Sequence, residues 1–181
     1  LVKEDVAETC RKGHTQFEPD RALDEPRQLT DEARAVLRRK FQEADVGVTG
    51  GNFMIAETGS TVIVTNEGNG DLTQILPKVH VVVTSIEKVI PTLEDVSTIL
   101  RLLARSATGQ EYSTYTTFST GPKRPGDLDG PEAFHVVIVD NGRSALLGTP
   151  AEEALRCIRC GACMNHCPVY AAVGGHAYGW V

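Results

Sequence analysis

The chain has 181 residues, of which 41% are hydrophobic and 23% are charged, and 18 basic against 24 acidic residues give a formal net charge of −6. This composition excludes a disordered or fibrous chain and predicts one globular core with room for a short appendage. The basic residues are scattered, which argues against nucleic-acid binding, and the longest apolar stretches (79–86 and 134–139) are too short to span a bilayer.

Helical periodicity marks the N-terminal part. Apolar residues at Val2, Val6 and Cys10 give a weak helical signal over residues 2–11, and the proline-containing residues 13–28 indicate a loop. A stronger helix is predicted over residues 30–44, with Thr30 as N-cap and one apolar stripe: Ala33, Val36, Leu37, Phe41 and Ala44. The first 20 residues are charged throughout and do not resemble a signal peptide, so we expect a soluble cytoplasmic protein.

Short strands are predicted next, over residues 46–49, 53–56, 61–65 and 78–85. Consecutive valines in the last of these indicate a strand that is buried on both faces. A helix is predicted over residues 92–106, because Thr92 and Asp95 form a capping box before an apolar stripe. Together these elements predict an α/β fold with an open sheet flanked by helices.

The C-terminal third begins with a proline- and glycine-rich loop over residues 121–133 and a strand over residues 134–140. Asn141-Gly142 is a tight-turn signal that would carry the chain into residues 144–147. Thr149, Pro150 and Glu152 predict a helix from Pro150 into Cys157. We therefore divide the chain into an α/β domain, residues 1–148, and a cysteine-bearing appendage, residues 149–181.

Four of the five cysteines fall within this appendage, at Cys157, Cys160, Cys163 and Cys167. The last is followed by Pro168, so the run reads C-x₂-C-x₂-C-x₃-C-P, which is the bacterial ferredoxin pattern for a 4Fe–4S cluster. In that pattern the fourth cysteine serves the other cluster of a pair. The run therefore predicts an electron-transfer protein and a second cysteine run beyond Val181, with the present sequence a fragment of a longer protein.

Two other interpretations of the cysteines stay open at this point. A structural zinc ion, with His166 as a further candidate ligand, usually takes two ligand pairs separated by a longer stretch. Disulfides are unusual in a cytoplasmic protein.

Three quoted segments resemble the lactate utilisation protein B family: residues 53–70 (FMIAETGSTVIVTNEGNG), residues 76–84 (LPKVHVVVT) and residues 157–170 (CIRCGACMNHCPVY). That family joins an LUD domain to a ferredoxin-like segment. The resemblance implies a fold similar to the ribose-phosphate isomerase and CoA-transferase group, incomplete here at its N-terminus. It also implies a flavin-independent iron–sulfur system that oxidises L-lactate to pyruvate, in which the intact protein holds two clusters and works with other subunits; a truncated chain could hold an incomplete cluster or none.

Loops at the two ends of the predicted strand 61–65 are candidate binding elements for a small carboxylate such as lactate or pyruvate, because α/β folds place ligand loops at strand ends. The candidates are Thr58, Gly59, Asn66, Gly68 and Gly70, with ordinary strand turns as the alternative. Gly68-Asn69-Gly70 does not match a dinucleotide fingerprint, since residue 73 is Thr and no helix is predicted there. His80, within an apolar strand, is expected to be a hydrogen-bonded core histidine.

Glu57 is a candidate base or nucleophile only by analogy with the CoA-transferase relatives of the fold. Two functions of different classes follow from the sequence. In the first, the cysteines relay electrons in lactate oxidation. In the second, the LUD domain binds small carboxylates or acyl-CoA compounds and the cysteines hold a structural zinc ion.

Overall fold

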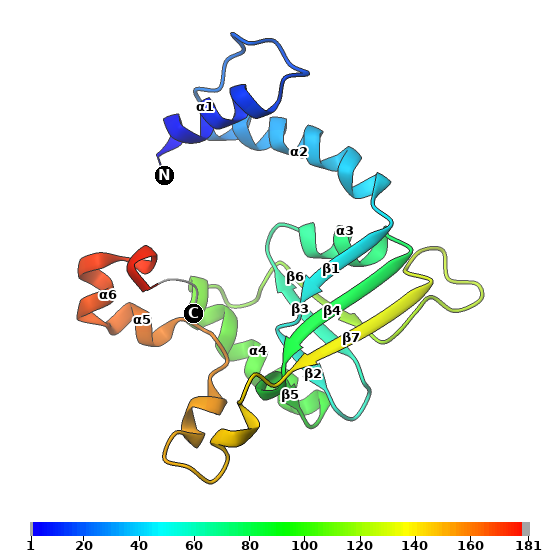
Figure 1. Cartoon of the computed structure of the whole chain (residues 1–181), viewed down its shortest axis with the longest axis vertical. Coiled ribbons are helices and arrows are strands. Elements are labelled where there is room, and N and C mark those ends of the chain that lie inside the picture. The colour runs from blue at the N-terminus through cyan, green and yellow to red at the C-terminus, as the bar shows by residue number, and fades with distance from the viewer. Residues whose placement is uncertain (1, 179–181) are drawn as a thin grey trace.

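The N-terminal helices form a pair that stands apart from the rest of the molecule (Figure 1). The computed structural model describes residues 2–178 and places α1 over Lys3–Gly13 and α2 over Pro26–Glu43. The first helix confirms the weak helical signal. The second begins at Pro26 rather than at Thr30, because Glu25 and Gln28 form a capping box and the Thr30 hydroxyl donates to the Pro26 carbonyl within the helix.

The strands are divided between two sheets rather than gathered in one open sheet. A parallel sheet has the order β1-β4-β7, with β1 at Val46–Gly50, β4 at Val79–Ser85 and β7 at Ala133–Val139. A mixed sheet has the order β5-β2-β3-β6, with β5 at Val89–Ile90, β2 at Phe53–Ile55, β3 at Thr61–Thr65 and β6 at Tyr115–Ser119. The α/β class and the flanking helices are confirmed, but β6 was not predicted.

The main core lies between the mixed sheet and α4, which spans Leu93–Thr108. Thr92 caps this helix and forms the predicted capping box with Asp95. The buried side chains of the core come from both elements: Phe53, Ile55, Val62, Val96 and Leu103.

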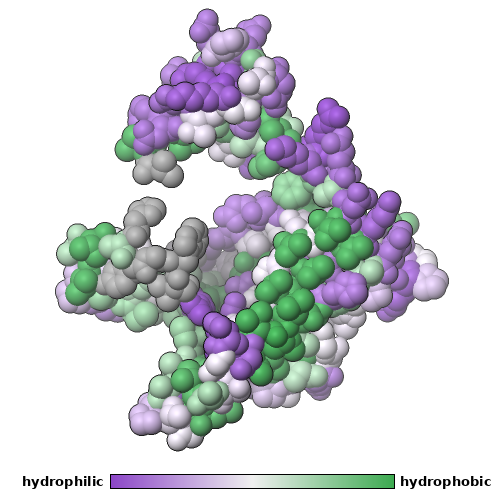
Figure 2. All heavy atoms as spheres, viewed as in Figure 1, coloured by the Kyte–Doolittle hydropathy of each residue, from purple (hydrophilic) through white to green (hydrophobic). Residues whose placement is uncertain are grey.

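One face of the parallel sheet is buried and the other carries exposed apolar side chains (Figure 2). In β4, His80, Val82 and Thr84 are buried, whereas Val83 is 39% exposed. The prediction that this strand is buried on both faces is therefore wrong. His80 is a core histidine as expected, and its Nε2 lies 2.8 Å from the Thr49 hydroxyl.

A short helix that was not predicted, α3 (Asn69–Ile75), follows β3. Gly68 precedes it in the left-handed conformation, at φ 74°, and its carbonyl accepts the first helical bond from the Leu72 amide. The expectation that no helix starts after Gly68 is wrong.

The chain after β7 forms turns and short helices. Asn141 and Gly142 both have positive φ, as the predicted tight turn requires, but a 3₁₀ helix, η2 (Ser144–Leu146), follows instead of an extended segment. The predicted α-helix from Pro150 is also absent. A 3₁₀ helix, η3, spans Glu152–Arg156 instead. The Glu152 carboxylate accepts a hydrogen bond from the Gly148 amide at its start, and the extended conformation of Cys157 ends it.

Candidate metal centre

The four clustered cysteines lie on an arm that projects from the α/β body on the side of α4 (Figure 1). Cys157 follows η3 in an extended conformation, and two helices complete the arm: α5 (Ala162–His166) and α6 (Pro168–Val173). A last 3₁₀ helix, η4, spans Gly175–Tyr178. Cys157 and Cys163 are exposed, while Cys160 and Cys167 are half-buried. The arm therefore presents thiols at the surface, where an inorganic group could reach them.

Left-handed backbone shapes the segment that joins the first three cysteines. Arg159 has φ 60° and Gly161 has φ 76°, so the residues on both sides of Cys160 lie in the left-handed region. Where such left-handed residues alternate with right-handed ones, successive amide groups can form a concave site that binds anions, and many Fe–S sites contain such concavities. A Cβ at residue 161 would make only an ordinary contact, 3.5 Å from the Met164 Cε, so the positive φ rather than lack of space is what favours glycine there.

Cys167 is separated from Cys163 by the single turn of α5 and serves as the N-cap of α6. The Tyr170 amide donates to the Cys167 sulfur at 3.4 Å, and Pro168 occupies the first turn of α6. Amide donation to ligand sulfurs is one of the ways in which proteins stabilise cluster thiolates. Pro168 thus follows the end of α5 at His166 and begins the next helix, a position that suits proline because its missing N–H is not needed there.

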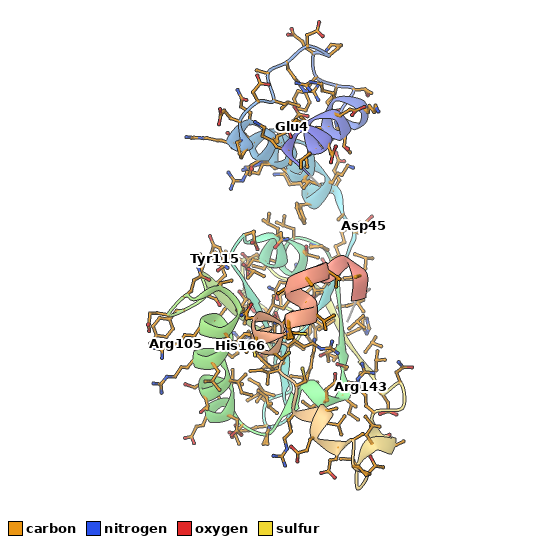
Figure 3. The ribbon with its side chains drawn as sticks, turned by 90° about the vertical axis from the view of Figure 1, so that its left-hand side faces the viewer. Glu4, Asp45, Arg105, Tyr115, Arg143 and His166 are labelled. Carbon is orange, nitrogen blue, oxygen red and sulfur yellow. The ribbon has the colours of Figure 1, made fainter. Side chains whose placement is uncertain are left out.

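The arm is attached to the body by contacts from its inner side. Ile158 and Cys160 pack against the main core, and the Asn165 side chain donates to the Ser106 carbonyl of α4 at 3.4 Å. His166 lies on the same arm, in front of the body in Figure 3. Cys160 is thus held against the LUD-like core, whereas Cys163 lies in α5 and Cys167 lies between α5 and α6.

The donor set fits an iron–sulfur cluster better than a single zinc ion. Within residues 2–178, the side chains whose ligand atoms all lie within 4.8 Å of one another are Cys10, His14 and Glu32, so no three of the clustered cysteines are that close. Four thiolates on one zinc would be separated by about 4 Å, given Zn–S bonds of about 2.3 Å. The preference for a 4Fe–4S cluster over zinc rests on the ferredoxin spacing of the four thiols.

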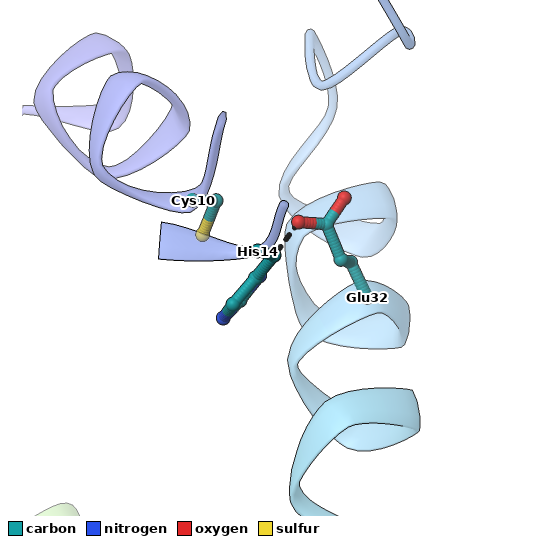
Figure 4. Close-up of side chains that lie close together, drawn as sticks. All are labelled: Cys10, His14 and Glu32. Carbon is teal, nitrogen blue, oxygen red and sulfur yellow. Dashed lines mark hydrogen bonds and ion pairs between the residues drawn. The ribbon is translucent and has the colours of Figure 1, made fainter. Parts of the chain in front are cut away.

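The group of Cys10, His14 and Glu32 joins α1 to α2 and was not predicted (Figure 4). His14 Nδ1 lies 2.7 Å from Glu32, and the Arg21 guanidinium contacts both carboxylate oxygens at 2.5 and 2.7 Å. These contacts, first of all that with Arg21, lower the pKa of Glu32 to about 2. Because Arg21 already compensates the carboxylate, we interpret the group as a buried ion-pair network.

The candidate loop before β3 is folded onto the N-terminus of α4. The exposed Glu57 carboxylate accepts from the Leu93 amide at 3.4 Å, and the Thr58 hydroxyl donates to Ser60, whose hydroxyl lies 2.7 Å from that of Thr120. Gly59 has φ 69° and its amide donates to the Ile55 carbonyl. These contacts are those of a strand turn.

The candidate loop after β3 is likewise engaged within the fold. The Asn66 side chain accepts from the Thr114 amide at 3.1 Å and donates to Gln110 at 3.2 Å, while the Gly70 amide donates to Asn69. The Gly68 amide belongs to the N-cap of α3. Since β3 lies between them, the two loops do not come together in one pocket.

A surface groove of about 300 Å³ lies between α4 and β6, and it includes none of the predicted ligand residues. Leu93, Leu100 and Phe118 line it together with Arg101 and Tyr112. The structure therefore places the predicted cysteines on a surface arm, and the role of the candidate carboxylate residues as ligands stays a prediction.

Glu87 is a further residue that the sequence did not point to. It lies in η1 (Ile86–Lys88) after β4 with a side chain only 6% exposed. Burial alone would raise the pKa of Glu87, but hydrogen bonds from Ser85 and Arg143 lower it below its usual range. The Arg143 Nε lies 2.8 Å from the Glu87 carboxylate, and Arg143 is labelled in Figure 3. Arg159, which stands between Cys157 and Cys160 in the sequence, has its Nη2 3.9 Å from the same carboxylate.

Comparison with known proteins agrees with the two-part architecture. Residues 2–139 match the LUD domain, and residues 153–179 match the 4Fe-4S dicluster domain. Lactate utilization protein B from Shouchella clausii is 52% identical over 98% of this chain and 36% of its own length, and the protein of that name from Bacillus subtilis is 54% identical over 86% of this chain and 33% of its own. The chain thus spans about a third of the length of these relatives.

Among solved structures, a DUF162 family protein from Deinococcus radiodurans aligns at a TM-score of 0.43 and 20% identity, over 56% of this chain and 57% of that one. Within the described residues, no helix is both long and apolar enough to cross a membrane. The LUD match covers more than half of the chain, and the cysteine arm coincides with the dicluster match. The chain belongs to the LUD domain family and joins that domain to a 4Fe–4S segment, as in the lactate utilisation B proteins that it resembles.

Proposed function

We propose that this chain is the part of an iron–sulfur electron-transfer subunit that holds a 4Fe–4S cluster during oxidation of L-lactate to pyruvate. Cys157, Cys160 and Cys163 would bind one cluster, and Cys167 would serve a neighbouring cluster completed by a second cysteine run. The observation that carries this proposal is the surface arm, which presents four cysteines in ferredoxin spacing next to an LUD domain. Its similarity to lactate utilization protein B supports the choice of substrate.

The bound cluster would accept and release single electrons. The chain's own residues present the thiols on the arm, place left-handed backbone at Arg159 and Gly161, and pack Ile158 and Cys160 against the main core. The lactate chemistry itself would need other subunits, because the candidate residues Glu57 and Asn66 make contacts within the fold. A cytoplasmic location is part of the proposal, since thiolate ligands persist in a reducing compartment.

Purification of the natural protein without oxygen tests this function. We expect iron and acid-labile sulfide in similar amounts, with broad absorption near roughly 400 nm that bleaches on reduction. The change Cys160→Ser should remove about half of the iron, that of one cluster of the pair. Cys10→Ser, on α1 and outside the arm, should leave the iron content unchanged. Equal iron loss in both variants, or zinc in place of iron, would contradict the proposal.

Reconstitution with the partner subunits tests the substrate. Lactate should reduce the cluster and yield pyruvate only when those subunits are present. Cluster reduction by lactate in this chain alone would show instead that the LUD domain carries the chemistry.

A further inference from the structure

The side chain of Glu87 joins three segments that are distant in the sequence. Its carboxylate accepts from the Ser85 hydroxyl at 2.7 Å and contacts Arg143, on the loop after β7, at 2.8 Å. Arg159 approaches the same carboxylate from the cysteine arm, with its Nη2 3.9 Å away. The buried acid therefore lies where the end of β4, the loop after β7 and the cysteine arm meet.

Positive charge is in excess around this carboxylate. Lys88, the next residue, is half-buried and donates to the Gly51 carbonyl at 2.9 Å. Burial lowers the pKa of Lys88, and the charges of Arg159 and Arg143 lower it further. The electric fields of the three cations therefore overlap, and the carboxylates of Glu87 and Asp140 offset two of the three positive charges.

The arm meets the core next to this group. Ile158 and Cys160 pack against the main core, and Arg159 between them adopts φ 60°, which is uncommon for a residue with a side chain. A left-handed arginine is strained and persists only when its surroundings hold it. The contacts of Ile158 and Cys160 with the core and of Arg159 with Glu87 are what hold it here.

We propose that Glu87 anchors the cysteine arm to the LUD domain through Arg159, and that the surplus positive charge of Arg143, Arg159 and Lys88 favours the reduced form of the bound cluster. The anchor follows from the contacts of the chain alone, whereas the effect on reduction rests on the proposed function. A 4Fe–4S cluster with thiolate ligands is anionic and gains one negative charge on reduction, so nearby cations stabilise the reduced form. Glu87, Arg143 and Arg159 are positioning residues in this account.

Hydrogen exchange of the metal-free, reduced protein tests the anchor. The amides of residues 157–166 should exchange several-fold faster in Glu87→Gln than in the parent, while α4 keeps its protection. Glu153→Gln is the matched control, because Glu153 pairs only with the exposed Arg156 on the same arm in the described contacts. Unchanged exchange in Glu87→Gln would overturn the anchor.

A second variant covers the case in which Glu87→Gln disturbs the core. Arg159 is 41% exposed and reaches Glu87 from the arm, so Arg159→Gln should loosen residues 157–166 without changing the unfolding midpoint of the LUD domain. Arg156→Gln should have no effect on either. Equal protection in Arg159→Gln and the parent would contradict the anchor independently.

The reduction potential of the iron-loaded protein tests the charge effect. Glu87→Gln removes a negative charge and should raise the midpoint potential, whereas Arg159→Gln removes a positive charge and should lower it. A purely structural role would not shift the two variants in opposite directions, so shifts of the same sign would refute the effect. If the parent takes up no iron, the proposed function and the charge effect both fail, while the exchange data still decide the anchor.

Discussion

Replacing Glu32 by glutamine should loosen the pair formed by α1 and α2. The Glu32 side chain is 7% exposed and pairs with His14 and Arg21, and the small core beside it contains only Ala7, Leu23 and Leu29 as buried apolar residues in the described cluster. Glutamine keeps the shape but removes the charge, which leaves the Arg21 guanidinium half-buried without its counter-ion.

The magnitude follows from the pKa of Glu32, which falls from 4.5 to about 2. At about 1.4 kcal/mol per pKa unit, this corresponds to at most about 3.5 kcal/mol of stability. The Arg21 and His14 side chains are 14% and 23% exposed, so solvent screens part of the attraction. We expect a loss of about 1–3 kcal/mol at pH 7, which is a large share of the stability of so small a unit.

The pH dependence has a defined sign. The pKa of Glu32 is lower in the folded than in the unfolded state. The contribution of Glu32 to the free energy of unfolding is therefore complete above about pH 4.5 and is lost as the pH falls towards 2. Urea unfolding followed by helix signal at pH 7, 4 and 3 should show this loss in the parent and a weaker dependence in Glu32→Gln. Glu43→Gln is the control, since Glu43 pairs with Arg39 on the exposed surface of the same helix. Equal stabilities of Glu32→Gln and the parent at pH 7 would refute the reasoning.

Other changes test the remaining parts of the structure. Val82→Ala should destabilise the LUD domain by about 2–3 kcal/mol in urea unfolding, because Val82 is fully buried, and a change below about 0.5 kcal/mol would contradict its place in the core. Asn66→Ala should lower the free energy of unfolding by about 1–2 kcal/mol, because it removes the hydrogen bond with the Thr114 amide. Calorimetry with lactate should give the same result for this variant and the parent. A loss of lactate binding without a loss of stability would show that Asn66 is a ligand residue. Burial lowers the pKa of His80 in the folded protein. The contribution of His80 to the free energy of unfolding is therefore complete above about pH 6.5 and is lost as the pH falls below that value. His80→Gln should weaken this dependence of stability on pH.

Much of the fold could be predicted because local signals agreed with the tertiary structure. The capping box of Thr92 and Asp95 and the apolar run of residues 61–65 both gave the correct elements. The division into two sheets could not be predicted, because it depends on pairing between distant strands such as β2 with β5. β6 has alternating polar residues and is half-exposed, so it carried little hydrophobic signal.

The candidate site shows the same contrast. The cysteine spacing is local, and it was sufficient to predict the 4Fe–4S segment that the dicluster match supports, while the four cysteines as its ligands stay a prediction. The contact between Glu87 and Arg159 depends on how the arm folds back onto η1, and no pattern in either segment indicates it. Glu57 and Asn66 were singled out by their positions at strand ends, but their contacts with Leu93 and Thr114 explain them as parts of the fold.

The metal and sulfide content of the natural protein, purified without oxygen, tests the central claim most directly. The account predicts iron and acid-labile sulfide in similar amounts, with both contents lowered in Cys160→Ser and unchanged in Cys10→Ser. Stoichiometric zinc with neither iron nor sulfide would contradict it.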